Sequence, residues 1–270
     1  MTGKFIAMCA PNGARKNKND HPALPISPSE LATCAEAIVE AGASVIHVHV
    51  RDDKGDHSLD VDRYRSAISA IREKVGDRLV IQATTEACGS YETEQQMAMV
   101  RALRPEAVSV ALREFCPDSE SESGAAEFYA WMNSERIMAQ HILYSPEEVF
   151  RFESLRERGV ICDEKPFVLY VLGRYATDLT GDIADLGRFI DSGSTDTSWA
   201  VCCFGSTESQ AASLAATKGG HARVGFENNL LLPDGGQARD NAELVKIAAD
   251  AAVAQSRTLA TADDVRSLFG

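Results

Sequence analysis

Eight short apolar runs alternate with amphipathic stretches along this 270-residue chain, and no other feature restricts its possible fold as strongly. Each run is rich in β-branched residues and is followed by a polar or glycine-bearing loop. Apolar strands that alternate with helices are typical of a parallel sheet buried on both faces. The predicted strands are 4–10, 45–50, 79–85, 107–112, 139–144, 167–173, 199–205 and 222–227. The predicted helices are near 28–42, 60–75, 93–103, 124–136, 146–158, 180–192, 208–218 and 238–255.

The regular count of these units predicts a (β/α)8 TIM barrel that forms one domain over residues 1–270. An open, doubly wound sheet would need a glycine-rich turn after the first strand. The turn at 10–15 reads APNGAR and lacks the GxGxxG pattern, so it favours the closed barrel. A helix start is also clear at Ser145, which precedes Pro146 and two glutamates.

The composition restricts the partners and the compartment. A net charge of −13 without a basic block argues against nucleic acid and anionic membranes as partners. The seven cysteines are an odd number and form no CxxC pair, which indicates reduced thiols in a cytoplasmic protein. The first residues do not resemble a signal peptide, and the apolar runs are far shorter than the roughly 20 residues of a membrane helix. We therefore expect small-molecule partners.

Two histidines lie two residues apart in the second predicted strand. Because side chains alternate between the faces of a strand, His47 and His49 project to one side, and Val48 and Val50 project to the other. Catalytic groups of such barrels gather at the C-terminal ends of the strands. Two imidazoles with this spacing near that end indicate one metal site. The alternative is a pair of hydrogen-bonded core histidines.

A glutamate and an arginine occupy the last predicted strand. By the same alternation Arg223, Gly225 and Glu227 share a face, and Glu227 is nearest the barrel mouth. A buried glutamate is unfavourable unless it is paired or bound to a metal. Two histidines and one carboxylate leave an open coordination position, so we expect zinc or another divalent ion at His47, His49 and Glu227. Arg223 is interpreted as a cation that neutralises a carboxylate, with a structural ion pair as the alternative.

Other predicted strand ends carry polar side chains that suit an anionic substrate, although any one of them could cap a helix or join a salt bridge. Three further histidines are interpreted as structural: His57, His141 and His221. The polar residues are Asn12, Arg15, Lys16, Lys18, Asp20 and His21 after the first strand, Gln82, Thr84, Thr85 and Glu86 on the third, Arg113 and Glu114 after the fourth, and Arg174 and Tyr175 after the sixth.

Several segments together resemble the β-keto acid cleavage enzymes, including the 3-keto-5-aminohexanoate cleavage enzymes. The resemblance extends from residue 4 to about residue 244. It implies a zinc-bearing (β/α)8 barrel that assembles as a homotetramer. It also implies a retro-Claisen exchange, in which a β-keto acid and acetyl-CoA give acetoacetate and a shortened acyl-CoA. The segments are PNGARKNKNDHPALPISPSE, AGASVIHVHVRDDKG, VSVALREF, QHILYSPEEV, VLGRY and GGHARVGFENNLLLPDG.

The resemblance also assigns roles by position. His47, His49 and Glu227 correspond to the metal ligands, and Arg223 corresponds to a residue that orients the catalytic acid–base group. Where the aminohexanoate enzymes carry an aspartate after the ligand glutamate, this chain has Asn228. That aspartate is the proposed base, so its replacement leaves the identity of the base in this chain open.

A neutral amide cannot accept a proton at physiological pH, so either another group acts as the base or the metal and Arg223 acidify the substrate more. The candidates are Glu86, Glu114 and Asp20, and the sequence does not choose between them. We interpret Asn228 as a hydrogen-bond donor to the enolate or the thioester, because an amide at the rim of a metal site suits an oxyanion.

The second departure concerns Arg15. Relatives that bind a cationic amino substrate carry an acidic residue near this position, so the reversed charge predicts a neutral-polar or anionic distal group on the substrate. Thr84, Thr85 and Arg113 are expected to hold the same distal end. The alternative is that Arg15, with the lysines that follow it, binds the phosphates of CoA.

Two other functions are compatible with a barrel that carries HxH. One is a metal-dependent hydrolase, but hydrolases of the amidohydrolase type place HxH on the first strand and add later histidines. Here the motif is on the second strand, and no later predicted strand ends in histidine. The other is a catalytically silent barrel that serves as a binding or assembly subunit.

Overall fold

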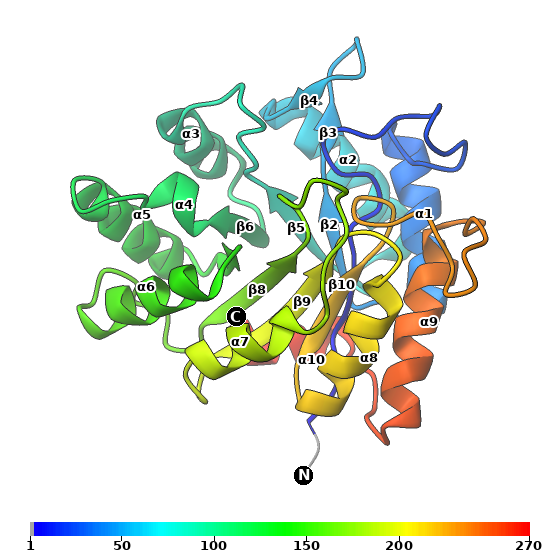
Figure 1. Ribbon diagram of the computed structural model, residues 1–270. Coiled ribbons are helices and arrows are strands. Elements are labelled where there is room, and N and C mark those ends of the chain that lie inside the picture. The colour runs from blue at the N-terminus through cyan, green and yellow to red at the C-terminus, as the bar shows by residue number, and fades with distance from the viewer. Residues whose placement is uncertain (1–2) are drawn as a thin grey trace.

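The computed structural model describes residues 3–270. Within this range eight parallel strands close into a barrel in the order β1-β10-β9-β8-β7-β6-β5-β2, with helices outside it (Figure 1). The predicted (β/α)8 barrel is therefore confirmed. The strands are β1 (Ala7–Cys9), β2 (Val45–Val48), β5 (Val80–Thr84), β6 (Ala107–Ala111), β7 (Met138–Leu143), β8 (Phe167–Leu172), β9 (Ser198–Cys203) and β10 (His221–Val224).

The predicted helices are also present, and α8, α9, α1 and α2 follow one another around one side of the barrel (Figure 1). Local signals place their starts: Ser27 and Ser145 each accept a hydrogen bond from the backbone three residues later and precede a proline. These helices are α1 (Pro28–Glu40), α2 (Val61–Val75), α3 (Thr93–Leu103), α5 (Glu122–Ser134), α6 (Pro146–Glu157), α7 (Asp185–Ser192), α8 (Glu208–Lys218) and α9 (Asn241–Ala254).

Three features were not predicted. The chain after β2 forms a small antiparallel pair, β3 (Val50–Arg51) with β4 (His57–Ser58), which a single apolar run does not reveal. A short helix, α4 (Leu112–Phe115), follows β6 directly. A last helix, α10 (Ala262–Phe269), lies under the barrel, where Phe269 stacks on Phe167 with their ring centroids 4.4 Å apart.

Two of the predicted strands end earlier than expected, and this changes how the candidate metal ligands are placed. β2 ends at Val48, so His49 follows the strand. β10 ends at Val224, because Gly225 has φ +130° and starts a turn. Glu227 is therefore carried by a turn, and strand alternation does not explain its orientation.

The barrel interior contains an apolar lower part and a polar upper part. Side chains such as Ile6, Val45 and Leu169 form the apolar part. Above it, Gln82 donates from Nε2 to Gln140 Oε1 at 3.3 Å, and Gln140 donates to Met8 Sδ at 3.5 Å. A buried amide needs such partners, and these contacts hold both glutamine side chains in one orientation.

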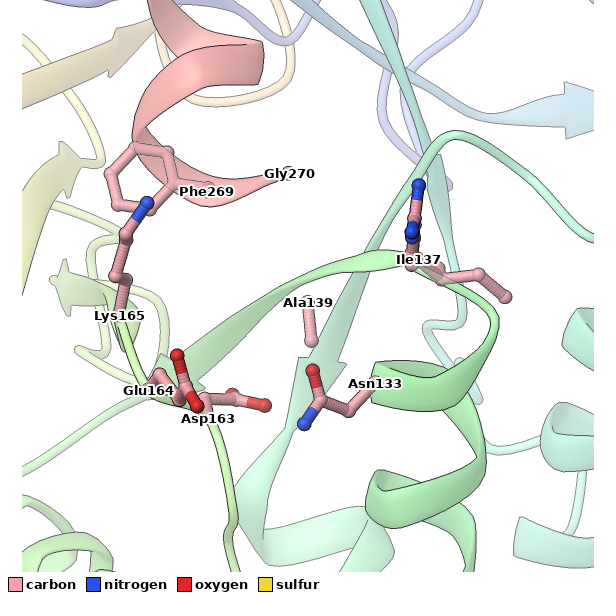
Figure 2. A pocket seen from close by; sticks show the side chains of 9 residues that line it. Asn133, Ile137, Ala139, Asp163, Glu164, Lys165, Phe269 and Gly270 are labelled. Atoms are coloured by element: carbon pink, nitrogen blue, oxygen red, sulfur yellow. The ribbon is translucent and has the colours of Figure 1, made fainter.

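Figure 2 shows a cavity of about 470 Å³ whose lining residues include Ala139 of β7, Lys165, which precedes β8, and the end of α10. It lies at the N-terminal ends of the strands. Catalytic groups of such barrels gather at the opposite ends, so this cavity is separate from the candidate site.

Within residues 3–270 no helix is long and apolar enough to cross a membrane. All seven cysteines are unpaired in this part of the chain, as expected for reduced thiols. Two of them, Cys202 and Cys203, are buried at the end of β9.

The closure of the barrel predicts a role for Arg257. This buried guanidinium donates to the backbone oxygens of Lys4 at 2.9 Å and Ala216 at 3.3 Å, and also to that of Gly220. It thereby joins the chain before β1 to the chain before β10. Arg257→Met leaves these oxygens without a partner, so we expect a loss of about 3 kcal/mol in the free energy of unfolding. Urea unfolding measures it, and the exposed Arg188→Met should change the midpoint little.

Candidate metal centre and active site

Three ligand atoms meet at the C-terminal end of the barrel. The Nε2 atoms of His47 and His49 are 3.1 Å apart, and Glu227 Oε2 lies 3.7 Å and 3.4 Å from them, respectively. Metal–ligand bonds of about 2.1 Å in a tetrahedral zinc site place neighbouring ligand atoms about 3.4 Å apart. Among the described residues Glu227 Oε2 has no hydrogen-bond partner although it is buried. The three residues therefore fit a divalent ion, and they are the ones predicted from sequence.

The turn that carries Glu227 is held at successive backbone groups. Glu227 N donates to Ala10 O at 3.0 Å, and Phe226 N donates to Asn241 Oδ1 at 2.8 Å. A Cβ on Gly225 would lie 2.6 Å from Ala10 O, so the turn and the backbone just after β1 touch only because this residue is glycine. The contact with Ala10 places the glutamate beside the histidines.

The protonation states of the ligands also suit a cation. Burial, together with the charge of Arg223, holds the pKa of His47 well below its usual value, so the ring is neutral. Burial raises the pKa of Glu227, but Arg223 and His49 lower this pKa by more than burial raises it. The net pKa is therefore well below the usual range. A neutral imidazole and an ionised carboxylate are the forms that bind metal ions.

Gln82 sets the tautomer of His47. Its Oε1 lies 2.8 Å from His47 Nδ1, and its Nε2 is occupied by Gln140. The glutamine therefore presents an acceptor, and Nδ1 must carry the ring proton. The Nε2 lone pair is left free to face Glu227, as in metal-binding histidines that donate from their other nitrogen.

Arg223 of β10 is buried next to the ligands. Its Nη2 lies 3.3 Å from Glu227 Oε1 and 3.6 Å from Cys202 Sγ. Burial lowers the pKa of Arg223, but Glu227 raises it more, so the guanidinium is charged. Within residues 3–270, Nε and Nη1 have no hydrogen-bond partner. A buried cation with unused donors is suited to bind an anion.

Asn228 has neighbours that determine the orientation of its amide. Its Nδ2 donates to Arg223 O at 3.1 Å and to Glu208 Oε1 at 3.3 Å, and its Oδ1 accepts from Cys202 Sγ at 3.1 Å. Both N–H groups are occupied, so the interpretation of Asn228 as a donor to an enolate or thioester is not supported. The side chain presents an acceptor to the barrel interior.

Glu208 was missed by the sequence analysis. It is the first residue of α8, a position where glutamate is normally solvated, and no pattern marks it as buried. Its carboxyl accepts from Gly225 N at 3.0 Å, and from the side-chain amides of Asn228 and Asn229, both at 3.3 Å. Burial raises the pKa of Glu208 to about 8, although these three donors lower it.

Glu86, a candidate base, lies at the rim between two arginines. Its Oε1 is 2.7 Å from Arg15 Nη1 and 3.6 Å from Arg174 Nη2. Burial raises the pKa of Glu86, but His49 and Arg15 outweigh it, so the net shift is downward. A carboxylate that is already paired and more acidic than usual is a poor proton acceptor.

The other predicted rim residues are engaged elsewhere. Arg113 donates from Nε to Glu148 at 2.6 Å, and its guanidinium lies over the rings of Tyr144 and Tyr175. Glu114 accepts from Gln96 Nε2 at 2.6 Å, and burial raises its pKa. These two side chains follow the strand end as predicted, but the hydrogen bonds direct them to α6 and α3.

The two threonines of the third predicted strand differ. Thr85 donates its hydroxyl to Ser109 O at 2.7 Å, whereas Thr84 Oγ1 accepts from Glu86 N at 3.0 Å and keeps a proton to donate. Asp20, the remaining candidate base, accepts from Asn17 N at 2.8 Å in its own exposed loop.

The sequence profile of β-keto acid cleavage enzymes matches residues 4–270. This chain belongs to that family. The family assignment agrees with the resemblance predicted from sequence, and it favours cleavage chemistry over the hydrolase alternative.

Curated relatives of this family member match over almost their whole length. The 3-keto-5-aminohexanoate cleavage enzyme of Fusobacterium nucleatum is 32% identical, with 100% of this chain and 98% of the relative covered. The 3-oxoadipate:acetyl-CoA acetyltransferase of Cupriavidus necator is 26% identical, covering 100% and 96%. The apo structure of ObcA is similar with a TM-score of 0.73 at 16% identity, over 92% of this chain and 66% of that chain, which supports the fold alone.

The contact between Gly225 and β1 gives a prediction. Gly225→Ala would add a Cβ 2.6 Å from Ala10 O, so we expect the turn to move and the protein to lose both stability and the capacity to bind a divalent ion at the candidate site. Gly219→Ala is the matched control, since this glycine also has positive φ but has open space around its Cα. The control should lose about 1 kcal/mol and retain the ion. Metal analysis after gel filtration distinguishes the two, and a Gly225→Ala protein with full metal content would contradict the assignment.

Proposed function

We propose that this family member is a metal-dependent enzyme that exchanges acyl groups between a β-keto acid and acetyl-CoA, giving acetoacetate and a shortened acyl-CoA. The observation that carries the proposal is the buried group of His47, His49 and Glu227, with one carboxylate oxygen unpartnered among the described residues. The names of two relatives, an aminohexanoate cleavage enzyme and an acetyl-CoA acetyltransferase for 3-oxoadipate, support the same reaction class.

Zinc is the ion we propose for this group. Two imidazole nitrogens and one carboxylate oxygen leave a further coordination position open, as in catalytic zinc sites. When bound, a divalent ion would supply Lewis-acid polarisation of a ketone and so favour its enolate. His47 and His49 would contribute Nε2, and Glu227 would contribute Oε2.

Arg223 would bind the negative charge of the substrate. Its Nε and Nη1 have no partner within residues 3–270, and its side chain is buried beside Glu227. A guanidinium can donate two parallel hydrogen bonds to a carboxylate, and in a site that excludes water these bonds are strong. This would orient the β-keto acid toward the metal ligands.

The rim favours a substrate whose distal end is not cationic. Arg15 and Arg174 share the single carboxylate of Glu86, so this cluster keeps one net positive charge. Thr84 keeps a hydroxyl proton that can donate to a polar distal group. We propose that the distal group is neutral-polar or anionic, as the 3-oxoadipate named for the Cupriavidus relative is.

A cytoplasmic homotetramer that uses no nucleic acid or membrane partner is part of this proposal. It rests on the family resemblance and on the acidic composition. Each chain supplies His47, His49 and Glu227 together, so the metal group does not need a second copy.

The metal assignment is tested with His49→Ala. The purified protein should contain about one zinc-like ion per chain, and this variant should lose the ion together with acetyl-CoA consumption, because one ligand is gone. His141→Gln is the matched control, since His141 is in β7 but contacts Asp163 outside the barrel. Full metal content in His49→Ala would rule out this site.

The distal-group assignment is tested with 3-oxoadipate, 3-oxohexanoate and 3-keto-5-aminohexanoate as substrates. We expect the aminated acid to have the lowest kcat/KM. Arg15→Ala should raise KM for the keto acid by about tenfold and leave KM for acetyl-CoA unchanged. A rise only in the acetyl-CoA KM would show that Arg15 binds CoA phosphates.

Lys18→Ala is the control for Arg15→Ala. Lys18 is in the same loop, but its ammonium lies 2.7 Å from Glu30 Oε1, away from the rim cluster. This variant should change neither KM. A wild-type preference of about tenfold or more for the aminated acid would overturn the charge argument.

A further inference from the structure

A chain of hydrogen bonds leads from Arg223 to Glu208 inside the barrel end. Arg223 Nη2 lies 3.6 Å from Cys202 Sγ, the thiol donates to Asn228 Oδ1 at 3.1 Å, and Asn228 Nδ2 donates to Glu208 Oε1 at 3.3 Å. A guanidinium can only donate, and Glu208 Oε1, which also accepts from the backbone N–H of Gly225, ends the chain as an acceptor. The direction of each bond between them is therefore determined by the two ends.

Among the residues in this series of hydrogen bonds, Asn228 is the one that holds two parts of Arg223. Its Nδ2 also donates to the backbone oxygen of Arg223 at 3.1 Å, so one amide holds both the main chain and, through Cys202, the side chain of that residue. If the amide turned over, its oxygen would face two acceptors, Arg223 O and Glu208 Oε1. The present orientation is the one its neighbours allow.

The position of Glu208 is unusual for a carboxyl group. It is 2% exposed, yet within residues 3–270 it forms no salt bridge, and the groups that it accepts from are neutral N–H donors. Burying a carboxyl without a countercharge is unfavourable. The other carboxyls at the C-terminal end of the barrel are used otherwise: Glu86 binds Arg15, Glu114 binds Gln96, and Glu227 belongs to the candidate metal group.

We propose that Glu208 is a positioning residue for the reaction, and that Glu208 and Asn228 act as one acid–amide pair that keeps Arg223 aligned with its Nε and Nη1 free. The inference rests on the proposed function, in which Arg223 binds the substrate anion. Glu208 contacts no substrate in this arrangement and acts through Asn228.

The pair is tested by exchanging its two groups, so that residue 208 carries the amide and residue 228 carries the acid. Asn228→Asp alone opposes one carboxyl to another and removes the donor to Arg223 O. Glu208→Gln alone leaves one acceptor oxygen for three N–H donors. The double variant restores an acid–amide contact with the opposite polarity, in which the residue 208 amide donates to the residue 228 carboxyl, which still accepts from Cys202. It does not restore the donor to Arg223 O, and it turns the residue 208 N–H toward Gly225 N.

We expect each single variant to lower kcat by about tenfold or more and the double variant to lose clearly less than the product of the two single losses. KM for acetyl-CoA should stay unchanged in all three, and Glu208→Gln should keep its metal content because its remaining oxygen can still accept from Gly225 N. The double variant should also melt about 2 °C or more above Asn228→Asp, because the unfavourable carboxyl contact is removed.

Asn241→Ala separates this role from simple anchoring of the turn. Asn241 accepts from Phe226 N in the same turn but forms no hydrogen bond with Asn228 among the described residues. We expect this variant to release metal faster to a chelator, whereas Glu208→Gln retains it.

Two results would overturn the pair: losses in kcat that simply multiply in the double variant, or a Glu208→Gln protein that releases metal as Asn241→Ala does. If the wild type fails to consume acetyl-CoA with any of the tested β-keto acids, it is the proposed function that fails. The melting temperatures of the four proteins still decide whether residues 208 and 228 are coupled.

Discussion

The buried carboxylate of Glu227 is the group on which the rest of the site depends. Removing this charge from water is unfavourable, and the protein compensates on one side only, where Arg223 Nη2 lies 3.3 Å from Oε1. The other oxygen, Oε2, faces His47 and His49, and burial lowers the pKa of His47, so that ring supplies no positive charge. One oxygen is thus matched by an arginine, and the second is left for a divalent ion.

A carboxylate in this position needs a rigid support, because a shift of a fraction of an ångström would separate it from the imidazoles. The turn after β10 supplies the support through contacts with β1, with Asn241 and with Glu208. These contacts come from three separate parts of the chain. Preorganisation of this kind keeps charged groups in place without reorganisation during a reaction.

Hydrogen bonding also explains which sequence-based assignments changed. Arg113 and Glu114 follow a strand end, which is where functional residues of barrels occur, but partners on α6 and α3 occupy them. Asn228 was assigned as a donor from its chemistry, yet its N–H groups face Arg223 O and Glu208. A residue type shows what a side chain can do, and its neighbours determine which of those bonds it makes.

The sequence by itself determined the barrel and its strand order in the chain, because apolar periodicity is a local property. It also named the three candidate ligands, although strand alternation does not account for the orientation of Glu227. The tertiary structure decided what depends on distant contacts: the turn that carries Glu227, the ion pairs that engage Glu86, and the burial of Glu208. Glu208 and Asn228 are distant in sequence and meet only because α8 packs against the end of β10. No local pattern encodes such a contact, since its energy arises when the barrel closes.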